Sequence, residues 1–171
     1  MSAGASRYHL FPWREQESYS GNRVLRPMVD VTLELGVFAT TTVSLVDTGA
    51  PRSVFPRGTG DALGIEFPDL RSLAPNTVIL MGREWPAVPL TVSLDLPPFQ
   101  DLGWEAEVDF VFDEGLPFAL LGYEGFLNRW AVSFNAYMGY FVVEPAEDFD
   151  ARIPEDTFRQ TLDRYPDQYN P

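Results

Sequence analysis

The sequence predicts an all-β fold with a short helical segment near its C-terminus. Apolar and polar residues alternate along several short stretches, and this period of two residues is typical of strands with one buried face. The chain of 171 residues contains 15 Pro and 13 Gly, which separate these stretches and mark turns. Helical patterns are confined to two brief segments, so the all-β class is favoured.

The first strands are expected after a polar arm dotted with aromatic residues. Residues 1–27 show no sustained period, and we interpret them as an arm that either docks on the domain or is partly mobile. Residues 29–35 alternate between apolar and polar, which predicts a strand. Residues 41–47 predict a second strand, and the two form a hairpin around residues 36–40.

The later part of the domain repeats this pattern. Half-buried strands are expected at residues 88–96 and 106–112, and residues 130–143 suggest a closing hairpin with its turn near 135–139. A short helical turn is expected at residues 61–64. A helix is also expected from Pro154 to about Arg164, because Pro suits the first helical position.

These elements divide the chain into three parts. We expect an N-terminal arm at 1–27, one domain at 28–145, and an acidic C-terminal extension with the short helix at 146–171. Hydrophobic residues make up 45% of the chain, which is enough for one domain with a substantial core.

The composition also limits the chemistry. Acidic residues outnumber basic ones by 25 to 12, and the net charge of -13 disfavours nucleic acid and anionic membrane surfaces as partners. The chain has no Cys and a single His, which are too few ligands for a structural zinc site or an iron–sulfur cluster. A Cys nucleophile is also excluded. We therefore expect no metal and no cofactor, and chemistry that rests mainly on carboxylates and hydroxyls.

Neither a secretory signal nor a membrane span is predicted. The first residues lack a positively charged start followed by an apolar run. No later stretch approaches the roughly 18 apolar residues of a spanning helix. The sequence therefore predicts a cytoplasmic protein.

The most informative stretch runs from Leu45 to Ala50 and reads Leu-Val-Asp-Thr-Gly-Ala. An apolar strand leads into Asp47, and an ionisable group at such a position is costly unless it has a partner or a function. Asp and Gly are also ordinary turn formers, so a simple turn is the alternative interpretation. The triplet Asp-Thr-Gly is short enough to arise by chance, and its setting gives it weight.

This stretch resembles the active-site motif of the retropepsin-like aspartic proteases, the family of the retroviral proteases and their cellular relatives. The likeness covers residues 28–145 in the expected order. Residues 63–65 are similar to the segment that follows the motif in cellular members, and residues 78–83 resemble the flap hairpin. Residues 118–122 resemble the hydrophobic-hydrophobic-Gly segment that closes the family's fold. The resemblance implies a closed, orthogonal acid-protease barrel.

The resemblance also implies a peptidase whose site is assembled at a two-fold axis. This chain has one such motif where a pepsin-like chain has two, so activity requires a homodimer in which each chain contributes Asp47. Two neighbouring carboxylates share one proton, because both cannot ionise cheaply side by side. The ionised carboxylate would activate a water and the protonated one would support the substrate carbonyl, with an optimum at acid to mildly acid pH.

The family's roles transfer residue by residue to the motif. Asp47 would hold the water, and Thr48 would hydrogen-bond across the axis. Gly49 would let the backbone approach a peptide substrate, and Ala50 would border the substrate channel.

The flap-like segment would supply further substrate contacts. Gly82, with Met81 and Arg83, would lie at or near the flap tip, although an ordinary hairpin glycine explains Gly82 equally well. Trp85 follows the flap and is the Trp expected to touch a ligand. Leu120 to Gly122 would pack beneath the catalytic loop.

The chain departs from the retroviral pattern. Retroviral members pair an Asp shortly after the motif with an Arg after the segment that resembles Leu-Leu-Gly, whereas here Pro51 and Arg52 follow the motif and Tyr123 follows Gly122. Residues 144–171 replace the C-terminal strand that joins retroviral dimers. Two alternatives to the peptidase therefore stand: a non-catalytic peptide-binding or self-association module, and an unrelated β-barrel whose Asp-Thr-Gly is a turn.

Overall fold

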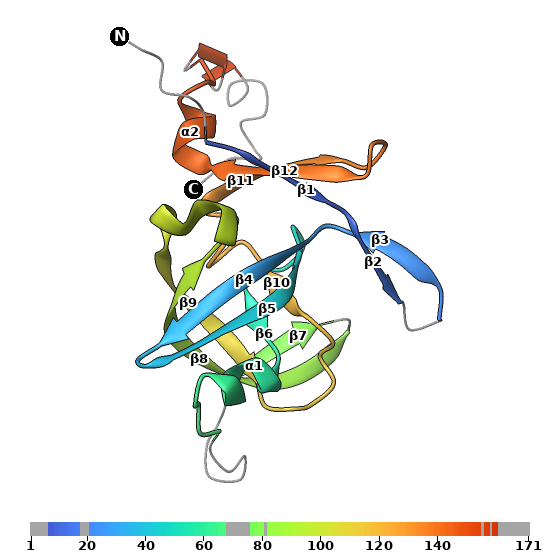
Figure 1. Cartoon of the computed structure of the whole chain (residues 1–171), viewed down its shortest axis with the longest axis vertical. Helices are drawn as coiled ribbons and strands as arrows, with labels where there is room; N and C mark the ends of the chain where they lie inside the picture. Colours follow the sequence, from blue (N-terminus) through green and yellow to red (C-terminus); the bar gives the residue numbers. More distant parts are fainter. Residues whose placement is uncertain are drawn as a thin grey trace.

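The computed structural model describes residues 7–17, 21–67, 76–80, 82–154, 156–157 and 159–160. Its strands form a large sheet, a three-stranded sheet and a separate two-stranded ribbon (Figure 1). The strands are β1 (His9–Pro12), β2 (Arg14–Glu17), β3 (Arg23–Arg26), β4 (Met28–Leu35), β5 (Phe38–Val46), β6 (Val54–Phe55), β7 (Asn76–Leu80), β8 (Arg83–Asp95), β9 (Trp104–Val111), β10 (Ala119–Leu121), β11 (Trp130–Asn135) and β12 (Tyr140–Pro145). The helices are α1 (Arg57–Ala62), α2 (Ala146–Asp150) and the 3-10 helix η1 (Pro97–Leu102).

The large sheet is mixed and has the strand order β4-β5-β10-β6-β9-β8-β7. The predicted hairpin is the antiparallel pair β4–β5, in which Leu35 faces Phe38 across a two-residue turn. Strand β4 also pairs with β8, which brings the sheet round on itself. The ring is uneven, because β10 and β6 are joined by a single residue pair. The all-β class is therefore confirmed, whereas a regular closed barrel is not established.

The core sits inside this curved sheet. The alternation that predicted β4 places Val29, Val31 and Leu33 in the interior with no exposed surface. An aromatic group extends the core toward the three-stranded sheet, with Trp104 and Trp130 in edge contact at 5.5 Å between ring centroids. Burial of each large apolar side chain contributes about 1.5–3 kcal/mol, so this cluster is the main source of stability.

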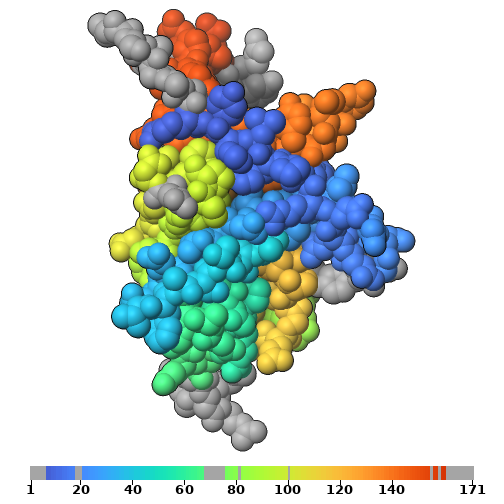
Figure 2. Space-filling view, in the orientation of Figure 1, coloured from blue at the N-terminus to red at the C-terminus, as the bar shows by residue number. Residues whose placement is uncertain are grey.

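The N-terminal arm docks on the C-terminal hairpin. Strand β1 pairs antiparallel with β12, which in turn pairs with β11, and Phe11 stacks on Phe141 at 5.4 Å. Figure 2 shows the N-terminal strands in blue lying against the C-terminal segments in orange. Of the two sequence interpretations, the docked arm is the one that the structure supports for β1, whereas β2 and β3 form a separate ribbon. Sequence patterns missed its strands because their partners are short or lie at the far end of the chain.

Helix α1 begins earlier than the predicted turn at 61–64. It starts at Arg57 and includes Gly58 and Gly60, two residues with poor helix propensity. Gly60 is buried so tightly that a Cβ atom would lie 2.5 Å from the ring of Phe67. Tertiary packing therefore overrides propensity here.

The C-terminal extension begins with a helix that the sequence did not predict. Helix α2 follows directly after β12, and the Ala146 N–H donates to the Arg129 carbonyl at 2.9 Å. Arg152 pairs with the buried Glu144 at 2.6 Å, and this pair ties the extension to β12. The helix expected at 154–164 is seen as helical backbone at 156–157 and 159–160, and residues 161–164 lie outside the described residues. No helix in the described part of the chain has the length and apolar character needed to cross a bilayer.

Replacing Phe11 by Ala tests the docking of β1. Phe11 is 8% exposed, so its loss should lower the free energy of unfolding by about 3 kcal/mol through lost burial and a residual cavity. The matched control is Leu10→Ala, because Leu10 is its neighbour in β1 and is 48% exposed. Its cost should stay below about 1 kcal/mol. Urea unfolding measures both variants, and equal losses would contradict the docked strand.

Candidate active site

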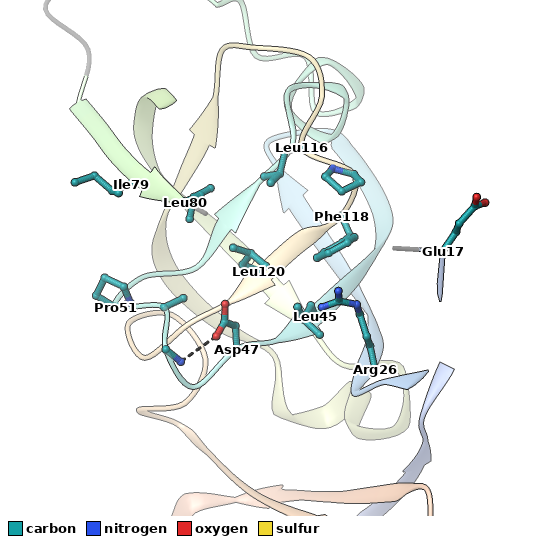
Figure 3. A pocket seen from close by; sticks show the side chains of 13 residues that line it. Glu17, Arg26, Leu45, Asp47, Pro51, Ile79, Leu80, Leu116, Phe118 and Leu120 are labelled. Carbon is teal, nitrogen blue, oxygen red and sulfur yellow. Dashed lines mark hydrogen bonds between the residues drawn. The ribbon is translucent and has the colours of Figure 1, made fainter. Parts of the chain in front are cut away.

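Asp47 comes directly after the carboxyl end of β5, beside the buried strand β10. Parallel pairing places Val46 opposite Leu121, and the Asp47 N–H donates to the Leu121 carbonyl at 3.0 Å. The Asp47 side chain turns back so that its Oδ1 accepts a hydrogen bond from the Gly49 N–H at 2.9 Å (Figure 3). The direction of the carboxylate is therefore set by the strand that ends at Val46 and by the turn that follows.

The rest of the motif forms this turn. The Ala50 N–H donates to the Asp47 carbonyl at 3.2 Å, which closes the turn. Ala50 is buried, whereas Thr48 and Gly49 are exposed. The exposed hydroxyl of Thr48 is accessible to another molecule.

The turn is held from behind by the segment after β10. The Tyr123 N–H donates to the Ala50 carbonyl at 2.8 Å, and the Glu124 N–H donates to the Pro51 carbonyl at 2.9 Å. Ser53, which is 1% exposed, joins the two segments through its side chain. Its Oγ accepts from the Gly122 N–H at 3.1 Å and donates to the Glu124 carbonyl at 3.0 Å. We call this set of contacts between residues 50–53 and 122–124 the loop crossing.

Gly122 makes the loop crossing possible. A Cβ atom at this position would lie 2.6 Å from the Ala50 carbonyl oxygen and would also collide with the Arg52 carbonyl. Both obstacles are backbone atoms, which cannot move aside as a flexible side chain can. The Leu-Leu-Gly segment therefore packs against the Asp47 loop in a way that requires Gly at its end.

Arg52 adds an ionic cluster on the same side of the loop. Its guanidinium donates to Glu107 at 2.7 Å and pairs with Asp109 at 3.1 Å and with Glu124 at 3.6 Å. The sequence lacks the retroviral pair at Pro51 and Tyr123, but the next residue in each segment supplies an ion pair of reversed sense. The Arg of this pair, Arg52, belongs to the segment after the motif, and its partner Glu124 belongs to the segment after Gly122.

Asp109 is the buried member of this cluster. It is 2% exposed, and burial raises the pKa of its carboxyl. Arg52 acts in the opposite direction, whereas Glu107 and Glu124 raise this pKa further. The Asp109 carboxyl therefore binds a proton more readily in the folded chain than in the unfolded one.

A cleft of about 520 Å³ opens in front of Asp47 (Figure 3). Its walls are mostly apolar, and the charged side chains that line it are Asp47, Glu17 and Arg26. The apolar lining consists of Leu45, Ala50, Pro51, Ile79, Leu80, Leu116, Pro117, Phe118 and Leu120. Within the described ranges no three acidic, His or Cys side chains gather as metal ligands.

The hairpin β7–β8 stands over one side of this cleft. Leu80 pairs with Arg83, and Gly82, which precedes Arg83, adopts a left-handed φ of 73°. Ile79 and Leu80, just before the turn, supply the cleft contacts. Met81 lies outside the described residues.

Arg83 and Trp85 lie elsewhere than the sequence interpretation expected. The Arg83 guanidinium pairs with Asp113 at 3.2 Å and lies 4.5 Å from the centre of the Trp85 ring. Trp85 is 3% exposed and packs with Leu80 and Leu116 in a second core cluster under the hairpin. Neither residue lines the cleft, because Trp85 is buried in this cluster and Arg83, stacked on it, remains exposed.

The structure thus brings together only some of the predicted residues. Asp47, Gly49 and Ala50 line one cleft, with Thr48 exposed beside them. Sequence reasoning missed Ser53, since a single Ser before an apolar pair carries no distinctive pattern. It also missed Arg26, which belongs to the arm that showed no period.

A comparison with solved structures finds a protein of similar fold. The chain is similar to a retropepsin-like aspartic protease from Rickettsia conorii, with a TM-score of 0.51 and 14% sequence identity. The match covers 84% of this chain and 96% of that protein. A scan against protein-family models finds no match, and a search of curated proteins finds none either. The likeness therefore shows a retropepsin-like fold.

Substitution of Gly122 by Ala tests the loop crossing. The added methyl collides with two carbonyl groups, so the free energy of unfolding should fall by about 3 kcal/mol. The matched control is Gly58→Ala in α1, where a Cβ atom would meet nothing within 4 Å. That change should stabilise the chain by up to about 1 kcal/mol. Thermal and urea unfolding measure both, and a neutral Gly122 variant would contradict the steric argument.

Two carboxyls with opposite pKa shifts give opposite pH dependences. Because the folded pKa of Asp109 is raised, the folded state binds more protons, and the wild type should gain stability relative to Asp109→Asn as pH falls from 7 toward about 4. Hydrogen bonds from Arg14, both 2.8 Å, lower the pKa of Asp30. The wild type should therefore lose stability relative to Asp30→Asn as pH falls below about 4. Urea titrations across this range test the two signs.

Proposed function

We propose that this protein is an aspartic endopeptidase that acts as a homodimer, with one Asp47 from each chain. The observation that carries the proposal is the position of Asp47. Asp47 comes directly after a core strand in a retropepsin-like fold. Its carboxylate accepts a hydrogen bond from the Gly49 N–H and lines a cleft of about 520 Å³.

The proposed chemistry needs only carboxylates and a water. Two Asp47 side chains at the axis hold one proton between them, because two ionised carboxylates in contact repel strongly. The ionised one takes a proton from the water, which attacks the peptide carbonyl carbon, and the protonated one donates to the carbonyl oxygen. The tetrahedral intermediate then collapses, the C–N bond breaks, and the leaving amine takes up the proton that the first carboxyl received from the water, so no covalent enzyme intermediate forms. Activity should peak at acid to mildly acid pH.

The exposed part of the motif supports assembly around Asp47. Thr48 is exposed in the single chain, where its hydroxyl can hydrogen-bond across the axis to a second copy. Gly49 lines the cleft with backbone only, which allows a peptide to approach closely. Ala50 borders the channel. The interface would differ from that of the retroviral enzymes, because the C-terminal hairpin here pairs with β1 of its own chain.

The cleft and the β7–β8 hairpin are proposed as the substrate-binding parts. Apolar walls suit peptides with large apolar side chains on both sides of the cleaved bond. The turn at Met81 and Gly82 would close over the peptide and exclude water. Arg83 and Trp85 support this hairpin from its other side, since Arg83 pairs with Asp113 and Trp85 is buried.

A second candidate is a non-catalytic module of the same fold that binds peptides or self-associates. The pairing of β1 with β12 within one chain favours it, because the terminal strands are already satisfied without a second copy. In this case the cleft would bind a peptide without cleaving it.

Cleavage of a mixed peptide library between about pH 4 and 7 tests the proposal. We expect wild-type cleavage to be lost in Asp47→Asn, by at least about a thousandfold, since the base that activates the water is removed. The control is Asp61→Asn, which removes an exposed carboxylate on α1 and should cleave normally. Unchanged cleavage by Asp47→Asn would refute the role of Asp47.

Mixing the two proteins tests the shared site. If each site takes one Asp47 from two chains, an excess of Asp47→Asn chains should reduce wild-type activity by forming inactive mixed dimers. Sedimentation equilibrium should show a dimer over the same concentrations. An active monomer, or a wild-type rate unaffected by excess variant, would contradict the dimeric site. A monomer that binds peptides and cleaves none would favour the second candidate.

A further inference from the structure

Among the described residues, Arg26 has no carboxylate partner, although the chain is strongly acidic. Acidic residues outnumber basic ones by 25 to 12, so a carboxylate is seldom far from an Arg. Ion pairs hold the arginines Arg7, Arg14, Arg23, Arg52, Arg57, Arg83 and Arg152. Arg26 makes no such pair with any described residue, and its Nε is buried without a described hydrogen-bond partner.

The position of Arg26 is set firmly beside the proposed catalytic loop. Arg26 ends β3, and the carbonyl of the next residue, Pro27, accepts a hydrogen bond from the Val46 N–H at 2.9 Å. Val46 directly precedes Asp47. The guanidinium carbon of Arg26 lies 5.8 Å from the centre of the Phe118 ring, which holds the charge against an apolar surface. Arg26, Phe118 and Asp47 all line the same cleft.

Glu17 and Asp47 are the acidic side chains that share this cleft with Arg26, and neither forms an ion pair with it. On the β2–β3 ribbon Glu17 faces Arg23, whereas Arg26 faces Arg14 at the other end of the ladder. Figure 3 shows the Glu17 carboxylate pointing away from the guanidinium of Arg26, which points toward Phe118. Arg14 is already engaged by Asp30 through two bonds of 2.8 Å. Among the described residues, Arg26 is therefore left in the cleft without an ion-pair partner.

We propose that Arg26, backed by Phe118, is a specificity residue that selects peptides with an acidic side chain at one position along the cleft. The inference rests on the proposed function, since it names the substrate that the same site would take. A guanidinium presents N–H groups in a planar fork that matches a carboxylate, and charge-assisted bonds of this kind are strong. An apolar wall around the pair strengthens the attraction.

The net charge of the chain further restricts which acidic peptides would be substrates. A net charge of -13 repels a peptide that is acidic throughout. Beyond about 10 Å this repulsion is largely screened at ordinary ionic strength, whereas a close pair with Arg26 is not. The preferred substrate is thus an otherwise neutral or basic peptide with a single Asp or Glu placed to reach Arg26.

Matched peptide pairs test the proposal. Peptides that the library experiment identifies are synthesised with Glu or Gln at each position in turn, and kcat/KM is measured at about pH 6. At one position the wild type should prefer Glu by about tenfold. Arg26→Gln should remove this preference, so that the Glu and Gln peptides have equal kcat/KM, and Arg26→Lys should restore part of it. The preference should also fade as pH drops below about 4.3, where a peptide Glu becomes neutral.

The control is Arg23→Gln, which removes a positive charge from the same strand. Arg23 pairs with Glu15, and its side chain is 80% exposed. The Glu preference should survive this change, so its loss would indicate a general charge effect and overturn the role of Arg26. Equal rates for Glu and Gln peptides at every position would overturn it as well.

A binding assay separates this proposal from the proposed function. If the wild type cleaves no peptide, fluorescence anisotropy of labelled Glu and Gln peptides is measured with the wild type and with Arg26→Gln. Tighter binding of a Glu peptide that disappears in Arg26→Gln would keep Arg26 as the selecting residue of a binding module. If the Glu and Gln peptides bind the wild type equally, the inference is wrong, whether or not the protein is a peptidase.

Discussion

The crossing between the Asp47 loop and the end of β10 is the constraint on which the rest of the structure depends. Five backbone and side-chain hydrogen bonds join residues 50–53 to 122–124. Glycine is the only residue type at position 122 that lets the two backbones approach so closely, because a Cβ atom would meet two carbonyl groups. This contact fixes Asp47 at the mouth of the cleft and aligns β10 between β5 and β6. The sheet can curve around its core only because this short central strand is held at both edges.

Two buried carboxylates of this acidic chain each form an ion pair with a nearby arginine. Asp109 and Glu144 are both buried, and each lies beside an arginine, because an isolated buried carboxylate would be costly to ionise. The two pairs have different tasks in the fold. Arg52 and Asp109 brace the loop that carries Asp47, whereas Arg152 and Glu144 tie the C-terminal extension to β12. The cleft differs from these two places, since its walls are mostly apolar and Arg26 forms no ion pair with a described residue.

Much of the fold was predictable from local pattern, and the misses share a cause. The alternation along residues 29–35 predicted β4, because a strand with one buried face leaves a direct record in the sequence. Strand β1 leaves no such record, since four residues are too few for a period and its partner β12 is distant along the chain. Helix α1 begins earlier than expected because tertiary contacts bury Gly60. Trp85 was expected at the cleft, but its side of β8 faces the second core cluster.

The sequence by itself determined the strand pattern, the absence of cysteine chemistry, and the place where a carboxylate ends an apolar strand. These features are local, because each depends on neighbours a few residues apart. Tertiary structure alone decided which side chains meet that carboxylate. Ser53, Gly122 and Arg26 come from three distant parts of the chain, and only long-range strand pairing brings them to the same loop and cleft. The physical reason is that backbone hydrogen bonds between strands do not depend on side-chain identity, so the sequence records their pairing only weakly.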